Sequence, residues 1–79
     1  MAAGGVVEID LHGKNAYQAK VTIDAALRRA KAGTYRLRIV HGYNGGTALR
    51  DMVRQEYAGR GLRVVVLDQG RTDLVLREF

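Results

Sequence analysis

Apolar and polar positions follow two different periods in the first half of the chain. Residues 6–12 alternate, which is the pattern of a strand with one face against a core; its apolar positions are Val7, Ile9 and Leu11. Residues 16–32 instead carry apolar side chains three and four positions apart, which predicts an amphipathic helix with the stripe Ala16, Ala19, Ile23, Ala26, Leu27 and Ala30. Asn15 and Gln18 form a capping-box pattern at its start, and Gly33 is expected to end it.

The second half repeats this strand-to-helix order and then adds two strands. We expect a strand over 35–41, a glycine-rich loop over 42–46, a helix over 48–58 capped by Thr47, and strands over 62–67 and 73–77. Gln69-Gly70-Arg71 has the composition of a turn. The short turn makes the last strand antiparallel to the third, whereas the helical connections make the first three strands parallel.

This order predicts an α/β (α+β) two-layer sandwich, β-α-β-α-β-β, with a mixed four-stranded sheet. Two right-handed crossovers in one direction put both helices on one face of the sheet. Charged residues alternate with the apolar ones on the strands, so the other face is expected to be open and charged: Glu8, Asp10, Arg36 and Arg38. We expect a flexible N-terminal tail over 1–5 and a single domain over 6–79.

Composition narrows the class of protein. The chain has 79 residues and no cysteine, so it is expected to be one domain without a disulfide framework or a cysteine-based zinc site. No apolar run approaches the roughly 18 residues of a membrane span. The first five residues lack the features of a signal peptide, so a cytoplasmic protein with no membrane association is the expectation.

The charge balance points toward a polyanionic partner. The net charge is +5, and arginines make up ten of the thirteen basic residues. The planar guanidinium group suits phosphate, so nucleic acid is one interpretation of this excess. The alternative is a domain whose charge serves solubility alone.

The two histidines of the chain, His12 and His41, each end a predicted strand and precede a glycine. Because the carboxyl ends of parallel strands share one edge of a sheet, we expect both imidazoles there, beside Asp10. The helices that follow begin at the same edge, and helix N-termini suit phosphate. Lys14 and Arg50 add positive charge, so the pattern predicts a phosphate site that contains acid–base groups.

Each of these features also has a purely structural explanation. A histidine at a strand end commonly hydrogen-bonds to backbone, and the glycines of 42–46 fit turn chemistry, without the Gly-Lys-Ser/Thr ending of a Walker loop. Asp10 can equally form a cross-strand salt bridge with Arg36 or Arg38. It is the combination at one edge that favours a functional site.

At these residues the sequence resembles the Smr (small MutS-related) domain family, as a short stand-alone member. The resemblance rests on Ile9-Asp10-Leu11-His12-Gly13 and on His41-Gly42-Tyr43-Asn44-Gly45-Gly46, and it covers the chain from about Val6 onward. It implies a fold similar to the C-terminal domain of translation initiation factor three. It also implies a nucleic-acid-binding domain, in several members an endonuclease that cuts DNA or RNA, with the ribosome or DNA-repair proteins as further partners.

The resemblance implies Asp10 and His12 as a catalytic pair, with His41 beginning the substrate-binding loop. The family loop has one residue between its glycines, whereas here Tyr43 and Asn44 intervene. The glycine-rich turn that precedes the family's last strand is reduced here to residues 69–71. The full set of expected substrate contacts is Gly13, Lys14, Gly42, Tyr43, Asn44, Gly45, Gly46, Arg50, Arg36 and Arg38.

The mechanism expected from these residues is phosphodiester cleavage without a required cofactor. His12 is the general base, oriented by Asp10, and His41 is the general acid or a donor to the transition state. Tyr43 is expected to stack on an unpaired base. A divalent metal such as Mg²⁺ on Asp10 and His12 is the alternative to the metal-free route. Two rival functions remain open: nucleic-acid binding without catalysis, and a protein contact through the open sheet face.

Overall fold

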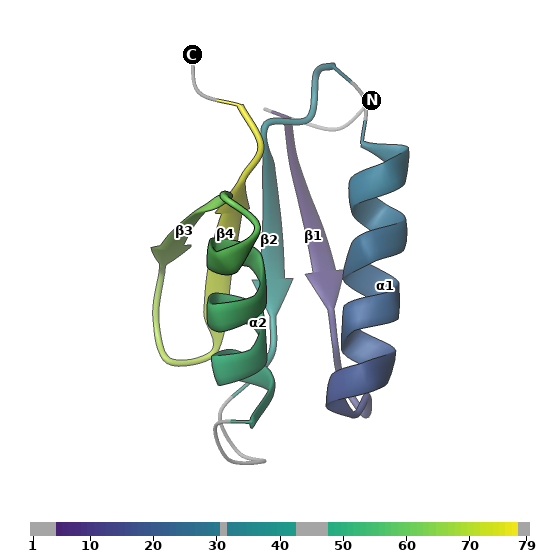
Figure 1. Ribbon diagram of the computed structural model, residues 1–79, viewed down its shortest axis with the longest axis vertical. Coiled ribbons are helices and arrows are strands. Elements are labelled where there is room, and N and C mark those ends of the chain that lie inside the picture. The colour runs from purple at the N-terminus through teal and green to yellow at the C-terminus, as the bar shows by residue number, and fades with distance from the viewer. Residues whose placement is uncertain (1–4, 31, 43–47, 78–79) are drawn as a thin grey trace.

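The computed structural model of this chain describes residues 5–30, 32–42 and 48–77. It contains the expected six elements, in the expected order (Figure 1). They are β1 (Val6–Asp10), α1 (Ala16–Arg29), β2 (Arg36–Val40), α2 (Ala48–Gly59), β3 (Arg63–Val66) and β4 (Arg71–Val75).

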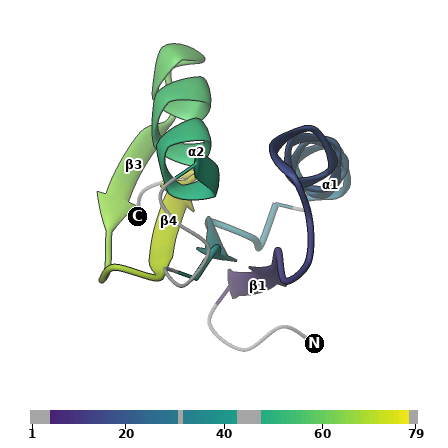
Figure 2. The ribbon, with the colours of Figure 1, turned by 90° about the horizontal axis from the view of Figure 1, so that it is seen from below.

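The four strands form one mixed sheet with the order β1-β2-β4-β3. β1 pairs with β2 in parallel, and β4 runs antiparallel to both of its neighbours, β2 and β3. Both helices lie on the same face of this sheet, and no described element covers the other face (Figure 2). The predicted two-layer α+β sandwich is therefore confirmed.

The core lies between the sheet and the two helices. It consists of alternate strand positions and of the apolar stripes of the helices, and the buried members are Leu11, Ala19, Ile23, Leu37, Ile39, Val53, Tyr57 and Leu74. Strand side chains alternate between faces, so one face of each strand supplies this set. The stripe predicted for α1 is buried where expected, at Ala19 and Ile23.

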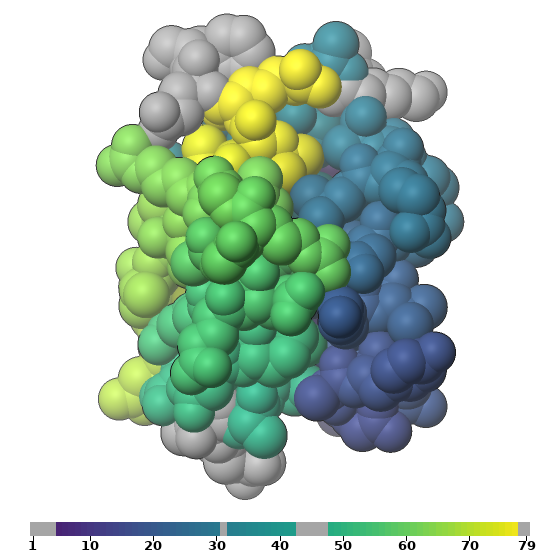
Figure 3. Space-filling model, in the orientation of Figure 1, coloured from purple at the N-terminus to yellow at the C-terminus, as the bar shows by residue number. Residues whose placement is uncertain are grey.

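The surfaces of α1 and α2 meet on the face seen in Figure 3, and we call this contact the seam. Polar side chains join the two helices there. The hydroxyl of buried Tyr57 donates to Asp24 Oδ1 at 2.7 Å, and Arg60 donates to the two oxygens of Asp24 at 2.9 and 3.3 Å. Burial would raise the pKa of the Asp24 carboxyl, but the hydrogen bonds from Arg60 and Tyr57 hold it below its usual value. Burial and Asp24 together raise the pKa of the Tyr57 hydroxyl.

The open face of the sheet carries an ionic cluster centred on β4. Asp73 is fully buried there beneath two arginines of β2. Arg38 donates to it through Nε at 2.9 Å and Nη2 at 3.0 Å, and Arg36 through Nη1 at 3.0 Å. Burial would raise the pKa of the Asp73 carboxyl, yet the bonds and charges of Arg38 and Arg36 hold it low. Arg36 and Arg38 thus pair with Asp73, and neither makes the salt bridge to Asp10 that was the alternative.

Element boundaries differ from the prediction by one to three residues, and the largest differences are in α1, β1 and β4. α1 ends at Arg29 instead of continuing to Ala32, because Ala30 adopts extended backbone (φ −63°, ψ 129°). This early exit lets the chain turn back toward the sheet, where the Tyr35 N–H donates to the Gly5 carbonyl at 2.9 Å. β1 ends at Asp10, and β4 begins at Arg71 because it pairs with β2 as well as with β3.

Gly5 is fixed by the same contact with the start of β2. Its φ of +71° is in the left-handed region that favours glycine, and a Cβ there would lie 2.3 Å from the Gly33 carbonyl oxygen. The rest of the expected tail, residues 1–4, lies outside the described residues. Neither described helix is long and apolar enough to cross a membrane.

Candidate nucleic-acid interface

The carboxyl ends of β1 and β2 lie side by side, as the parallel pairing requires. Asp10 is paired with Val40, and the Leu11 N–H then donates to the Val40 carbonyl at 2.9 Å. Both helices begin at this end of the sheet (Figure 1). The β3–β4 turn joins it, because the N–H groups of His41 and Gly42 donate to the Gly70 carbonyl at 2.9 and 3.0 Å.

We call this region the histidine edge and define it by residues 10–14, 41–42 and 68–71. Of the predicted site residues, it contains Asp10, His12, Gly13, Lys14, His41 and Gly42. Arg50 lies close by in the first turn of α2. The structure therefore brings together the two histidine-glycine turns and the carboxylate that the sequence predicted to be neighbours.

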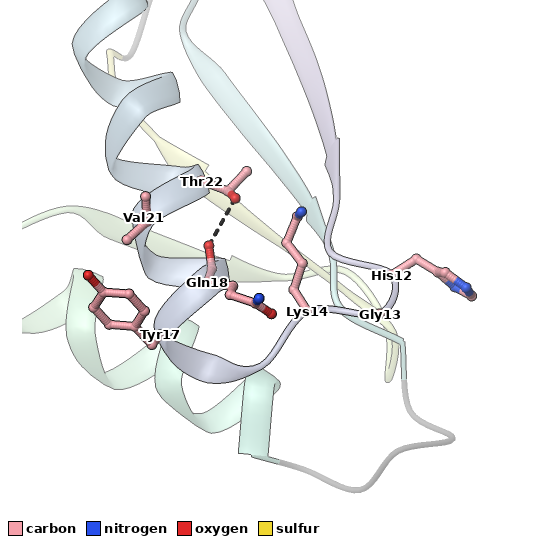
Figure 4. Close-up of a pocket in the computed structure, with 7 residues that line it drawn as sticks. All are labelled: His12, Gly13, Lys14, Tyr17, Gln18, Val21 and Thr22. Carbon is pink, nitrogen blue, oxygen red and sulfur yellow. Dashed lines mark hydrogen bonds between the residues drawn. The ribbon is translucent and has the colours of Figure 1, made fainter.

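A tight turn holds the first histidine. Asp10 Oδ1 accepts a hydrogen bond from the backbone N–H of His12 at 2.9 Å, and the Lys14 N–H donates to the Leu11 carbonyl at 3.0 Å. Gly13 has a φ of +75°, which a residue with a Cβ rarely adopts. The carboxylate therefore fixes the backbone of the turn. The His12 side chain is exposed and is directed away from α1 (Figure 4).

His41 is held at both ring nitrogens. Nδ1 lies 3.0 Å from the Gly42 carbonyl oxygen and Nε2 lies 2.9 Å from Thr72 Oγ1. Because a carbonyl can only accept, the neutral ring has its proton on Nδ1, and Nε2 then accepts from the Thr72 hydroxyl. Arg54 of α2 donates to the same hydroxyl oxygen at 3.2 Å. These bonds link the start of the glycine-rich loop to buried Thr72 and to α2.

The loop itself contributes little that can be described. Tyr43, Asn44, Gly45 and Gly46, together with the expected cap Thr47, lie outside the described residues. Gly42 is described, and its φ of +71° again favours glycine. Beyond the loop, Arg50 donates through Nε to Asp51 Oδ1 at 3.2 Å, so a neighbouring carboxylate partly compensates its charge.

The start of α1 is capped from within the chain. Asn15 Oδ1 accepts from the Gln18 N–H at 2.8 Å, and Gln18 Oε1 accepts from the Asn15 N–H at 3.0 Å. The predicted capping box is thus confirmed. The capping box satisfies two backbone N–H donors, so the start of α1 has fewer donors left for an anion than the sequence predicted. The positive charge at this helix start comes from Lys14.

Arg36 and Arg38 lie away from the histidine edge. Arg36 is the first residue of β2 and is four residues from the end of that strand, which corresponds to about 13 Å. Both arginines are engaged by Asp73 on the open face. The structure therefore separates Arg36 from the histidines by distance, and it pairs both predicted substrate contacts with Asp73.

The β3–β4 turn adds charges that the sequence did not single out. Asp68 accepts from Arg71 Nη2 at 2.7 Å and Nε at 2.9 Å, and from the Gly70 N–H at 2.9 Å. The Arg71 hydrogen bonds, followed by that of Gly70, lower the pKa of the Asp68 carboxyl. Across residues 5–30, 32–42 and 48–77, no three His, Asp or Glu side chains lie where they could share a metal ion.

A surface pocket of about 440 Å³ opens beside the first turn of α1 (Figure 4). Its lining begins at the histidine edge and continues along the helix: His12, Gly13, Lys14, Tyr17, Gln18, Val21 and Thr22. Tyr17 is 76% exposed, the largest exposed fraction among the large apolar side chains that the structure describes. The sequence reasoning missed Tyr17, although its position off the buried stripe of α1 already indicated an exposed aromatic ring.

The fold and the site define a small α+β domain with histidine-glycine turns at the ends of two parallel strands. Residues 9–77 match the family model of the Smr domain, so this chain belongs to the Smr family. Membership indicates nucleic-acid binding or a nuclease-related function. No curated protein and no solved structure matches the chain, so the expected likeness to translation initiation factor three stays a prediction.

Proposed function

We propose that this chain binds single-stranded RNA at the histidine edge and cleaves its phosphodiester backbone, with His12 as the acid–base group. The observation that carries the proposal is the state of the His12 side chain. It is exposed at the edge where both helices begin, and its ring has no hydrogen-bond partner among the described residues. An exposed imidazole on a hydrogen-bonded turn is available to take a proton from a substrate.

The reaction that this set of groups suits is attack by the ribose 2′-hydroxyl on the adjacent phosphorus. His12 takes the 2′-hydroxyl proton as the O2′–P bond forms. The P–O5′ bond then breaks, and the leaving 5′-oxygen takes a proton from water. Lys14 directly follows the His12-Gly13 turn and Arg50 lies in the first turn of α2, and in this proposal they stabilise the charge that develops on the phosphoryl oxygens.

His41 has a different part in this proposal from the acid role expected of it. Both of its nitrogens are bound to protein groups, Thr72 and Gly42, and it would have to release one of them to reach a substrate. We assign His41 to positioning: it orients the start of the glycine-rich loop against β4 and α2. Asp10 acts in the same manner on the His12 turn, through the backbone N–H.

A divalent ion does not fit the described donors well. Asp10 and His12 supply one carboxylate and one imidazole, and Mg²⁺ prefers oxygen ligands in octahedral geometry. No third His, Asp or Glu within the described ranges completes the set. No step of the proposed reaction is therefore routed through a metal.

Binding without cleavage is the second candidate, and one observation favours it. The Asp10 carboxylate bonds to the His12 backbone instead of the imidazole, so no described group orients the ring for proton transfer. In that case the edge holds phosphate through Lys14, Arg50 and backbone donors, and His12 is a donor only. A protein contact through the open sheet face is a weaker rival, because its arginines are already paired with Asp73.

The test compares variants of the edge with variants elsewhere, using a labelled single-stranded RNA for both binding and cleavage. Lys14→Ala and Arg50→Ala should weaken binding and reduce its salt dependence by about one released ion each. Arg28→Ala is the matched control, since it removes one exposed positive charge at the opposite end of α1. His12→Ala should abolish cleavage and retain binding. Weakening by Arg36→Ala alone, with its folding verified, would instead favour the open face.

A further inference from the structure

The pocket beside α1 extends the histidine edge in one direction. It begins at His12 and Gly13, passes Lys14, and reaches the exposed ring of Tyr17 on the first turn of the helix (Figure 4). Because the His12 ring points away from α1, a strand bound at this ring would cross the Gly13 turn before it meets the cation Lys14 and then the aromatic face of Tyr17. Neither the family assignment nor the sequence pattern gave Tyr17 a role.

The side chains of the pocket match the parts of a nucleotide. Tyr17 offers an exposed ring for stacking, and Val21, 49% exposed and one turn further on, adds apolar surface beside it. Lys14 supplies a positive charge for a phosphate. Gln18 Oε1 already accepts from the Asn15 N–H, which leaves the amide NH₂ group as a donor toward a ligand.

The backbone at Gly13 permits a strand to come close. Among the described residues other than Gly13 and its two chain neighbours, no atom lies within 4 Å of the place where a Cβ would stand, so one side of the turn is open. The pocket volume of about 440 Å³ lies within the range of small-ligand sites, roughly 300–1,000 Å³. An unpaired base has the flat apolar faces and polar edges that such a mixed lining accommodates.

We propose that this pocket binds one unpaired base of the strand, stacked on Tyr17, with its phosphate held by Lys14. The proposal rests on the proposed function, because it takes the occupant to be the same strand that is bound at His12. It adds that the protein requires an unpaired base next to the reacting phosphate. Fully paired duplex, whose bases are not available for stacking, should therefore bind less tightly than single strand.

The experiment uses a 2′-O-methyl RNA strand of about 12 nucleotides, which cannot be cut by 2′-hydroxyl attack, together with versions that carry one abasic position each. Tyr17→Leu should weaken binding of the intact strand by about 5- to 150-fold, which corresponds to one stacked base. Tyr17→Phe keeps the ring and should bind like the unaltered protein. One abasic strand should lose the same factor with the unaltered protein and lose nothing further with Tyr17→Leu.

Tyr17→Trp supplies a second readout, since the chain has no other tryptophan. Its fluorescence should be quenched when the intact strand binds, and much less by the strand that is abasic at the critical position. This signal reports the stacking contact and does not depend on the stability of the fold.

The failures of the two proposals are distinguishable. If the unaltered protein binds and Tyr17→Leu binds equally well, the base pocket is wrong while the histidine edge stands. The same holds if Tyr17→Leu weakens intact and abasic strands equally, or changes only self-association in sedimentation. If the unaltered protein binds no strand at all, the proposed function fails first and the pocket fails with it.

Discussion

Asp73 is the residue whose replacement tests the ionic cluster of the open face most sharply. Asp73→Asn keeps the size of the side chain and removes its charge. The three hydrogen bonds from Arg36 and Arg38 lose the negative charge of their acceptor, although both guanidinium groups stay charged, and one of the bonds now faces an NH₂ group. A hydrogen bond to a charged group is worth about 1.5–3 kcal/mol against about 1 kcal/mol for a neutral pair.

The free energy of unfolding lost is smaller than the sum over the three hydrogen bonds, because solvent reaches the arginines. The side chains of Arg36 and Arg38 are 34% and 32% exposed, so water replaces part of what they lose. We expect the free energy of unfolding to fall by about 2 kcal/mol at pH 7, which lowers the midpoint temperature of a domain this small by about 8–16 °C. Asp68→Asn is the control: Asp68 and its partner Arg71 are both exposed, so the loss of stability should be clearly smaller than for Asp73→Asn.

The assay is urea unfolding followed by circular dichroism, at neutral and at acid pH. Since the pKa of Asp73 is lowered in the folded protein, its contribution is complete above the unfolded value, about 3.9, and is lost as the pH falls through the folded value. The difference in the free energy of unfolding between the unaltered protein and Asp73→Asn should therefore be constant above about pH 5 and become smaller below about pH 4. A gap under about 0.5 kcal/mol at pH 7, or one that does not narrow in acid, would refute this account.

Three further predictions concern the contact between the helices at Tyr57, the turn at Gly13, and the hydrogen bond between Thr72 and His41. Tyr57→Phe removes the buried hydroxyl that donates to Asp24, so the free energy of unfolding should fall by about 1 kcal/mol in urea titrations, and no loss would contradict the bond. Gly13→Ala forces a Cβ into a positive-φ turn and should cost about 1–2 kcal/mol in the same titrations, although no described residue beyond the chain neighbours of Gly13 lies near that Cβ; an unchanged midpoint would show that the turn relaxes freely. Thr72→Val removes the hydroxyl that His41 and Arg54 contact. The free energy of RNA binding, from a gel-shift assay, should therefore fall by more than the free energy of unfolding does. Unchanged binding would remove His41 from the site.

Much of the fold was predictable because local patterns in the sequence indicate its helices and strands. The alternation over 6–12 and the stripe of α1 each bury the expected face, and Asn15 with Gln18 caps α1 as its spacing indicated. The parallel ends of β1 and β2 followed from the helical connection between them. The predicted convergence of His12 and His41 depended on these local rules alone.

The parts that were missed depend on contacts between distant segments. The insertion of β4 between β2 and β3 decides the order of the sheet, and no local pattern of the last strand encodes it. The same pairing brings Asp73 under Arg36 and Arg38, which turned two expected substrate contacts into a structural pair. It also places Thr72 against His41, a partner 31 positions earlier. The early end of α1 follows from the return of the chain to Gly5. The apolar stripe of the helix does not indicate this long-range contact.

The central claim is that His12 takes a proton from a ribose 2′-hydroxyl at the histidine edge. The most direct measurement is single-turnover cleavage of a single-stranded RNA in EDTA, beside the same strand with one 2′-deoxy nucleotide at the cut position. The account predicts a product with a 2′,3′-cyclic phosphate, no cut at the deoxy position, and a rate for His12→Ala lower by about 10²- to 10⁴-fold. Cleavage by His12→Ala at a rate close to that of the unaltered protein, or a strand that is bound and stays intact with the unaltered protein, would contradict it.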